Sequence, residues 1–184
     1  IHALVSKKSI KPALLEELEE GLQRVDDILH GVSLLAELSD KTLARLMSFG
    51  ERLSCFIIAG ALTEVNLKGV YVNATQLIKT DSNYVAAKVN FDRTNKNILE
   101  YFEHLHGIPV ITGFIGTDEF NDITTLGRGG SDYTAAIFGA ALKVSAIEIW
   151  SDVDGVLTAD PRRVDQAMTV PALSYKEAME LSHF

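Results

Sequence analysis

The sequence predicts an α/β domain in which helices alternate with strands. Three observations along the second half of the chain support this fold class. A β-rich run at 108–116 ends in a glycine-flanked turn, as a core strand of a parallel sheet does. A glycine-rich turn at 126–130 precedes an apolar run with helical spacing, and 146–150 has the pattern of a further strand before an acidic turn. This order is a βαβ progression, in which ligands bind beyond the carboxyl ends of the strands.

The composition is that of a soluble globular domain, with 184 residues of which 47% are hydrophobic and 23% are charged. The net charge of -8 argues against nucleic acid or an anionic membrane as the main partner. The single cysteine, Cys55, lies in an apolar helical run, where we expect it to be a buried packing residue. Because no intramolecular disulfide can form, we expect a reducing, cytoplasmic setting.

No targeting or membrane signal is visible in the sequence. No uninterrupted apolar window reaches 18 residues, and the N-terminus lacks the layout of a signal peptide. The chain starts without Met and stops at Phe184, inside a predicted helix. We therefore expect it to be a piece of a longer protein.

The first third of the chain is predicted to be helical. A stripe of apolar residues runs from Pro12 and indicates a helix that Gly31 ends. Ser39 has the position of an N-cap for a second helix. A third, buried helix is predicted over 55–62, closing near Asn66, with Glu51 at its start.

The predicted elements continue in order along the chain. They are a strand at 70–72, a polar loop at 80–83, a strand at 85–91, a helix at 95–106 that stops at Gly107, the core strand, a hairpin or mobile loop at 117–125, and a helix at 131–142.

The glycine turn before the last of these helices is a candidate anion-binding site. Its glycines let backbone amides approach an anion, and the helix N-terminus adds unpaired N–H donors and partial positive charge. Ser131 is a candidate N-cap, and Arg128 offers a planar fork that matches a carboxylate or phosphate oxygen. Taken alone, the turn is better explained as a simple glycine turn whose serine caps the helix, since such loops are common.

Five motifs in a fixed order make the sequence resemble the aspartate kinase family within the amino-acid kinase fold. They are FGERLS, TDSNY, VITGFIG, GRGGSDYTAA and WSDVDGVLTADPRR. The resemblance runs from about Gly31 to Phe184 and implies a three-layer αβα sandwich with a mainly parallel sheet, incomplete at both ends, with 1–184 forming a fragment of the catalytic domain.

The resemblance also implies an activity. The family uses ATP and Mg²⁺ to phosphorylate the side-chain carboxylate of L-aspartate, giving 4-phospho-L-aspartate, the first step towards lysine, threonine and methionine. It further implies that the full-length enzyme is a homo-oligomer.

Site residues carry over where the letters agree. Glu51 matches the acidic residue that holds the α-ammonium group of the substrate. Arg128 matches the arginine that grips a substrate carboxylate, and Asp132 matches an acidic residue associated with the active centre. Gly129, Gly130 and Ser131 fall on the nucleotide side of the same turn.

A second group of matches lies further along the chain, also on the nucleotide side. Ser151 and Asp152 correspond to a Thr-Asp pair beside the adenine and ribose, with Ser keeping the hydroxyl. Arg162 matches an arginine near the phosphates. Leu157 departs from the pattern, since a tyrosine often packs near the nucleotide there.

Other parts of the family pattern are missing. The Lys-Phe-Gly-Gly-Thr-Ser loop, the lysine of a Phe-Gly-Ala-Lys motif that Phe184 would begin, and the regulatory ACT domains are absent from the sequence. Because lysines in these segments neutralise the transferring phosphoryl group, we expect no turnover from residues 1–184 alone.

Several residues keep a plainer interpretation. Glu51 could cap a helix, and Asp152 and Asp154 could be turn formers beside Gly155. The loop residues Asp81, Asn83 and Tyr84 could be merely solvated. The histidines at 104, 106 and 183 lack ligand spacing, so no metal site is predicted.

Two rival functions stay open, and a third is rejected. The acceptor could be glutamate, carbamate or UMP, although FGERLS and TDSNY speak against this, or the chain could be a folded core without catalysis. A dinucleotide-binding Rossmann domain is rejected because no GxGxxG follows the first strand.

Overall fold

The structure, a computed structural model, describes residues 11–181; residues 1–10 and 182–184, which include His183 and Phe184, lie outside the described part. Contacts between residues divide the chain into two units, Ile1–Ile147 and Glu148–Phe184. Each unit is described by itself.

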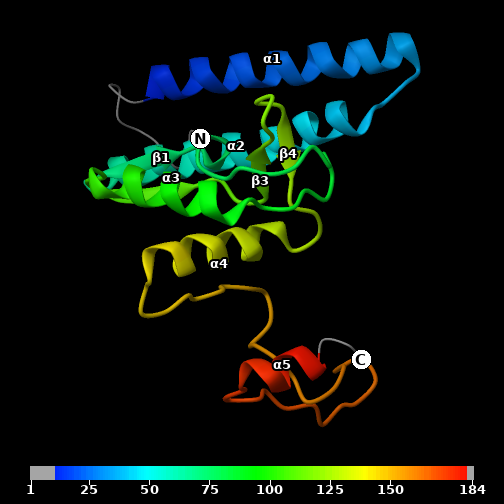
Figure 1. Cartoon of the computed structure of the whole chain (residues 1–184), viewed down its shortest axis with the longest axis vertical. Coiled ribbons are helices and arrows are strands. Elements are labelled where there is room, and N and C mark those ends of the chain that lie inside the picture. The colour runs from blue at the N-terminus through cyan, green and yellow to red at the C-terminus, as the bar shows by residue number, and fades with distance from the viewer. Residues whose placement is uncertain (1–10, 182–184) are drawn as a thin grey trace. The chain divides into compact units, whose positions relative to one another are not determined.

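The first unit begins with a helical hairpin formed by α1 (Lys11–Leu35) and α2 (Asp40–Glu64). The prediction that Gly31 ends the first helix is wrong, because α1 continues through it to Leu35 and the chain turns at Ala36, where φ is 51°. A glycine inside a helix costs only about 1 kcal/mol relative to alanine, which packing against a neighbouring helix outweighs. Figure 1 shows α1 running antiparallel along α2.

Helix α2 is a single element where two helices were predicted. Its predicted N-cap is confirmed, since Ser39 Oγ accepts a hydrogen bond of 3.2 Å from the Thr42 amide. The helix then runs through Gly50 without interruption and closes before Asn66, where φ is 63°. Residues on both sides of Gly50 are buried, so tertiary packing holds this stretch helical. Glu51 therefore lies in mid-helix, which rules out a capping role.

The strand predicted at 70–72, β1 (Gly69–Val72), pairs parallel with β2 (Ile108–Ile111), with Gly69 opposite Ile108 and Val72 opposite Ile111. The core strand predicted over 108–116 is wrong as one element, because the chain leaves this pair after Ile111 and residues 115–117 join a separate antiparallel pair. Successive side chains of a strand point to opposite faces. Accordingly Val72 enters the buried core, whereas the Tyr71 ring meets the Phe56 ring of α2 edge-on at 5.6 Å.

The core lies on the face of β1 that is opposite α2. Helices α3 (Phe91–Glu103) and α4 (Gly130–Leu142) contact each other there. A short 3₁₀ helix at Ala74–Gln76 follows β1. The buried core cluster consists of Val72, Ala74, Leu77, Ile78, Ile98, Ile137, Phe138 and Ala141.

The predicted strand at 85–91 is wrong. Only an isolated bridge between Thr80 and Val89 forms there. The side-chain oxygen of Asn90 accepts a hydrogen bond of 3.1 Å from the Arg93 amide, so Asn90 becomes the N-cap of α3, which starts four residues before its predicted start at Asn95. The chain therefore enters α3 at Asn90 and does not form the extended strand that the apolar residues of this segment favour.

The acidic segment after the core strand is a hairpin, one of the two outcomes predicted for it. Strands β3 (Ile115–Thr117) and β4 (Ile123–Thr125) pair antiparallel. Their turn is held by Asp118, which is 2% exposed and accepts hydrogen bonds from the amides of Phe120 and Asp122.

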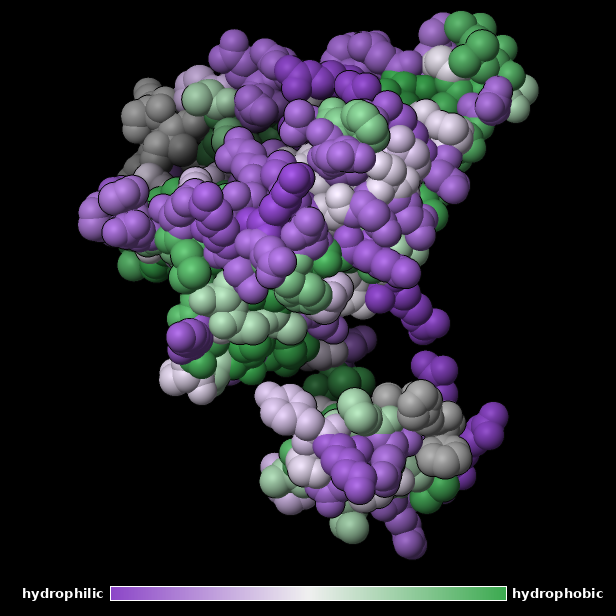
Figure 2. Space-filling view, in the orientation of Figure 1, coloured by the Kyte–Doolittle hydropathy of each residue, from purple (hydrophilic) through white to green (hydrophobic). Residues whose placement is uncertain are grey.

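The layers of the first unit agree with the predicted αβα order. Helix α2 packs between α1 and the strands, and α3 and α4 pack against each other; Figure 1 shows α1 and α4 at opposite ends of the first unit, with α2, α3 and the strands between them. Helix α2 is long and apolar enough, by length and composition alone, to cross a membrane. It contacts α1, β1, β2 and β4, so it is packed among the other elements of the layered domain. Figure 2 shows apolar side chains gathered over α4 and at the tip of the α1–α2 hairpin.

The predicted strand at 146–150 is also wrong. Within residues 11–181 no strand pairs with it, and Ile149 and Trp150 are 53% and 91% exposed. A strand needs a neighbour for its backbone hydrogen bonds, and an apolar, β-branched sequence cannot replace that neighbour. The second unit contains a bridge between Leu157 and Thr169 and a short helix, α5 (Tyr175–Leu181).

Candidate functional site

A pocket of about 460 Å³ opens between α2 and the glycine turn. Segments far apart in the sequence form its wall: one face of α2, the link between β2 and β3, and the turn that leads into α4. Its lining residues are Met47, Glu51, Val85, Phe114, Gly127, Arg128, Gly129, Gly130, Ser131 and Asp132. Every site residue predicted in the first unit therefore lines this one pocket.

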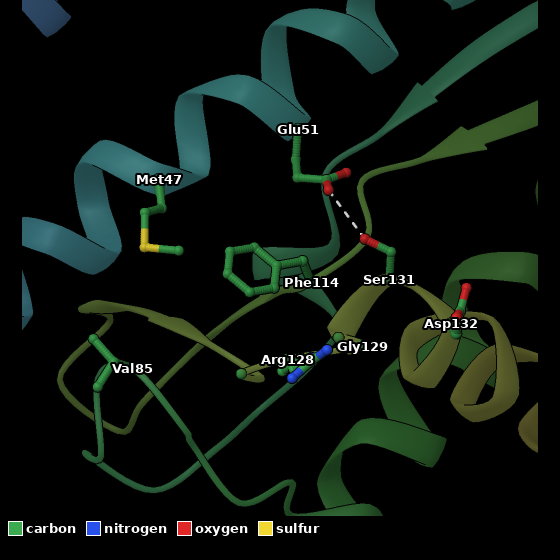
Figure 3. Close-up of a pocket in the computed structure, with 10 residues that line it drawn as sticks. Met47, Glu51, Val85, Phe114, Arg128, Gly129, Ser131 and Asp132 are labelled. Atoms are coloured by element: carbon green, nitrogen blue, oxygen red, sulfur yellow. Dashed lines mark hydrogen bonds between the residues drawn. The ribbon is translucent and has the colours of Figure 1, made fainter. Parts of the chain in front are cut away.

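A hydrogen bond joins the two sides of the pocket. Ser131 Oγ donates to Glu51 Oε1 at 3.0 Å, across 80 positions of sequence (Figure 3). Glu51 is partly buried on α2, and Ser131 lies in the first turn of α4. The bond fixes one carboxylate oxygen and leaves the other free to accept a donor from a ligand.

The predicted role of Ser131 as an N-cap is wrong. The N-cap of α4 is Gly129, which has φ of 72° and provides no side-chain cap. Left-handed backbone is readily accessible to glycine and costly for most other residues. The glycine thus brings the chain into the helix without a capping oxygen, and the Ser131 hydroxyl is free to reach Glu51.

The N-terminus of α4 presents amide donors to the pocket. A helix leaves its first N–H groups without intrahelical partners, and here no side chain caps them, although the Gly130 amide donates to the Gly127 carbonyl at 3.0 Å. Gly130, in the first turn, is buried, and a Cβ at this position would come within 2.7 Å of the Phe114 ring. Only glycine therefore lets the turn lie this close to Phe114.

Phe114 is a pocket residue that the sequence did not single out. It has φ of 68°, an unusual conformation for a bulky residue that costs about 1–3 kcal/mol. Its amide donates to Thr134 Oγ1 at 2.9 Å, and its carbonyl accepts from the Leu126 amide at 2.8 Å. These bonds to α4 and the glycine turn hold the ring in the pocket wall (Figure 3). The signal in the sequence was its position between glycines in VITGFIG, although that pattern does not say which residue faces the pocket.

The pocket combines opposite charges. Arg128 and Asp132 are both exposed, and among the ion pairs of residues 11–181 none involves either of them. Glu51 supplies a further carboxylate from α2. One turn after Glu51, burial raises the pKa of the Cys55 thiol, and the Glu51 charge adds to this shift. Cys55 is 8% exposed and donates to the Ile111 carbonyl at 3.4 Å, which confirms its predicted packing role.

The other predicted site residues belong to the second unit and are exposed there. Ser151 Oγ donates to Asp152 Oδ1 at 3.2 Å. The backbone amide of Arg162 donates to Asp160 Oδ1 at 2.9 Å, so its guanidinium is not used in that contact. Leu157 lies in the bridge to Thr169.

Asp81 is exposed but not merely solvated, because it has a structural role in the 80–83 loop. Asp81 Oδ1 accepts hydrogen bonds from the amides of Asn83 and Lys88, so the side chain closes its own loop. In the part of the chain that the structure describes, no three His, Cys, Asp or Glu side chains gather as a metal site would require.

Comparison with known proteins gives a consistent result. The sequence matches the family model described as "Amino acid kinase family" over residues 1–184. It is 36% identical over 178 residues to a bifunctional aspartokinase/homoserine dehydrogenase of Buchnera aphidicola, covering 96% of this chain and 21% of the relative. It is 38% identical over 168 residues to the chloroplastic aspartokinase 1 of Arabidopsis thaliana, covering 89% of this chain and 30% of the relative.

A solved structure shares the fold. The crystal structure of E. coli aspartokinase III in complex with aspartate and ADP aligns with a TM-score of 0.85 at 30% identity, covering 92% of this chain and 38% of that chain. The chain spans between 21% and 30% of the length of the two curated relatives described above.

Proposed function

The chain belongs to the amino acid kinase family, and on that premise we propose that it is part of the catalytic domain of an aspartate kinase. The reaction transfers the γ-phosphoryl group of ATP to the side-chain carboxylate of L-aspartate. The observation that carries the proposal is the pocket that holds Glu51 and Arg128 on facing elements. The names of the similar proteins and the aspartate and ADP in the solved structure support it.

The pocket suits a zwitterion. We propose that Glu51 binds the α-ammonium group of aspartate and that Arg128 binds a carboxylate through its planar fork. The bond from Ser131 holds Glu51 in one rotamer before the substrate arrives, which lowers the entropy lost on binding. A simple dicarboxylate would leave Glu51 facing a like charge or no partner, so the site would select an amino acid.

The glycine turn suits the nucleotide. We propose that phosphate oxygens lie against Gly129, Gly130 and Ser131 and accept hydrogen bonds from the amides of Gly129 and Ser131, as at helix N-termini, since the Gly130 amide already donates to the Gly127 carbonyl at 3.0 Å. Asp132, in the first turn of α4, would lie beside the reacting groups. The adenosine and phosphate roles of Ser151, Asp152 and Arg162 stay predictions from the family resemblance.

The chemistry requires charge neutralisation rather than a general base. A side-chain carboxylate is already ionised at neutral pH, so it can attack without losing a proton. The difficulty is that the acceptor carboxylate and the phosphate are both anions and repel each other. Cations and oriented amides at the bridging oxygens reduce this repulsion. Arg128 and the amides of the glycine turn are the groups in this chain that would do so.

Mg²⁺ would neutralise further charge on the phosphates. It is usually held by one or two carboxylates together with substrate phosphates, and not by an all-protein cage. The described residues fit this mode, since Asp132 is available in the pocket and no three-ligand cluster is present among them. We further propose a cytoplasmic location and a homo-oligomeric parent enzyme.

The experiment uses the longer protein that contains this chain. ADP release is measured with L-aspartate, L-glutamate, carbamate and UMP as acceptors. We expect turnover with L-aspartate; turnover with another acceptor alone would replace this proposal with one of the rival kinases, and no turnover with any would favour a folded core without catalysis.

The same enzyme tests the residue roles. Glu51→Ala and Arg128→Ala are each expected to raise the KM for aspartate roughly tenfold or more, because each removes a charge-assisted hydrogen bond. Binding of a non-hydrolysable ATP analogue, measured by calorimetry, should stay nearly unchanged. Glu103→Ala, which removes an exposed carboxylate at the end of α3, is the matched control. Equal loss of both ligands in either variant would contradict the assignment.

A further inference from the structure

Helix α2 carries a second functional pattern on another face. Basic and aromatic residues recur along it every three or four positions, which places them in one stripe. The stripe consists of Lys41, Arg45, Phe49, Arg52 and Phe56. Met47 and Glu51, which line the pocket at the glycine turn, lie outside this stripe.

Two cavities lie along the stripe, at the contact between α1 and α2. One has a volume of about 280 Å³ and the other about 270 Å³. They share Arg24 from α1 and Phe49 and Arg52 from α2, so they are adjoining parts of one cleft, which we call the basic cleft. Neither includes any residue of the glycine turn.

The basic cleft gathers positive charge in a chain whose net charge is -8. Arg24, Lys41, Arg45 and Arg52 all line it. Lys41 pairs with Asp122 at 2.6 Å and Arg24 with Glu20 at 2.9 Å.

Two of these cations lack a counter-charge. Over residues 11–181, no carboxylate lies within ion-pair distance of Arg45 or Arg52. Glu17 also lines the cleft, but it forms no ion pair with either of them.

Arg52 is held in place yet incompletely satisfied. Its guanidinium carbon lies 5.3 Å from the centre of the Phe49 ring, within range of a cation–π contact. Its Nε is buried and has no hydrogen-bond partner among the residues that the structure describes. Buried donors are nearly always paired, so an unpaired one in a cleft indicates a missing acceptor.

Tyr71 lines the same part of the cleft. Burial raises the pKa of its phenol, and the neighbouring Arg52 opposes this shift. The phenol therefore stays neutral at physiological pH and provides a donor beside the guanidinium. Asn73 adds an amide to this wall.

We propose that the basic cleft binds a small multivalent anion through Arg45 and Arg52. Guanidinium forks match carboxylate and phosphate oxygens in pairs, and the aromatic floor under Arg52 keeps its fork oriented. The cleft volumes suit a ligand of metabolite size. This site goes beyond the proposed phosphoryl transfer and does not depend on it, because it uses the opposite stripe of α2.

Calorimetric titration of the chain with citrate and, separately, with inorganic phosphate tests the proposal. We expect saturable binding of at least one probe, weakened about tenfold or more in Arg45→Ala, since one charge-assisted pair is lost. Arg45→Lys should recover part of the affinity, because it restores the charge without the fork. Binding of citrate alone would indicate a carboxylate ligand, and binding of phosphate alone a phosphorylated one.

Two controls separate this site from other charges. Lys96→Ala removes an exposed lysine of α3 and should leave binding unchanged. Arg128→Ala should leave the part of the binding that Arg45→Ala weakens unchanged, and any part that Arg128→Ala alone removes belongs to the glycine turn, so that failure of this proposal and failure of the kinase proposal give different results. Arg45 is exposed, so its replacement leaves the fold intact even where Arg52→Ala does not.

The absence of saturable binding of both probes would overturn the proposal. An equal loss of affinity in Lys96→Ala would also do so, because it would reveal a general charge effect. A loss in Arg128→Ala with none in Arg45→Ala would move the bound anion to the glycine turn.

Discussion

Gly129 and Gly130 are neighbours, yet the structure predicts that they tolerate substitutions in opposite order. Gly129 has φ of 72° and open space around its missing Cβ. Gly130 has no positive φ, but a Cβ there would lie 2.7 Å from a Phe114 ring carbon and 3.2 Å from Leu126 Cβ. The constraint at the first is conformational, and at the second it is steric.

The free energies of unfolding follow from these constraints. Gly129→Ala should cost about 1–2 kcal/mol, the penalty for a β-carbon in left-handed backbone, whereas asparagine, which visits that region more readily, should cost less. Gly130→Ala should cost about 1–3 kcal/mol by overpacking, reduced by up to about 1 kcal/mol from the better helix propensity of alanine. Gly130→Asn should be worse, because its larger side chain must displace Phe114.

Urea unfolding followed by circular dichroism at 222 nm measures these differences. The helical signal comes mainly from α1 and α2 in the first unit, whereas the only tryptophan, Trp150, belongs to the second unit. We expect the Asn variant to be more stable than the Ala variant at position 129, and the Ala variant to be more stable than the Asn variant at position 130. The same order at both positions would refute the assigned backbone and packing.

Two further predictions concern α2. Gly50→Ala should stabilise the chain by about 0.5–1 kcal/mol, because Gly50 lies inside the helix with no atom within 4 Å of an added Cβ. Gly60→Ala is the matched control and should not stabilise, since its Cβ would lie 2.5 Å from Leu14 Cδ1; stabilisation by both would contradict this packing. The Cys55 thiol, whose pKa is raised by burial, should react with a thiol reagent at pH 8 far more slowly in the native chain than in urea, and equal rates would show that it is not buried.

The order of most elements could be predicted from the sequence because local chemistry determines them. Ser39 marks a helix start since its side chain caps the backbone, and the apolar runs at β1 and β2 form partly buried parallel strands. The gathering of Glu51 with Arg128 in one pocket was also expected. That expectation came from motifs shared with a known family, since no local sequence pattern relates two positions so far apart.

The errors arise where tertiary structure decides the outcome. Gly50 was expected to separate two helices, but the modest propensity cost is outweighed by burial of its neighbours on α2. Residues 146–150 have strand-forming side chains and no pairing partner within residues 11–181. Ser131 has a residue type that caps helices, and it could not be known from the sequence that Gly129 would take that place.

The continuity of α2 decides how the two candidate sites relate to each other. Had Gly50 broken the helix, the segments before and after it could have moved independently. In one helix, residues three or four positions apart keep a fixed face, so Glu51 stays on one stripe and Arg45 and Arg52 on another. An anion bound to Arg45 and Arg52 therefore acts on the element that carries Glu51. Any effect on the glycine turn must pass through the side chains of that face, among which Glu51 is hydrogen-bonded to Ser131. We therefore expect a ligand in the basic cleft to alter aspartate binding in the parent enzyme through the position of the Glu51 carboxylate.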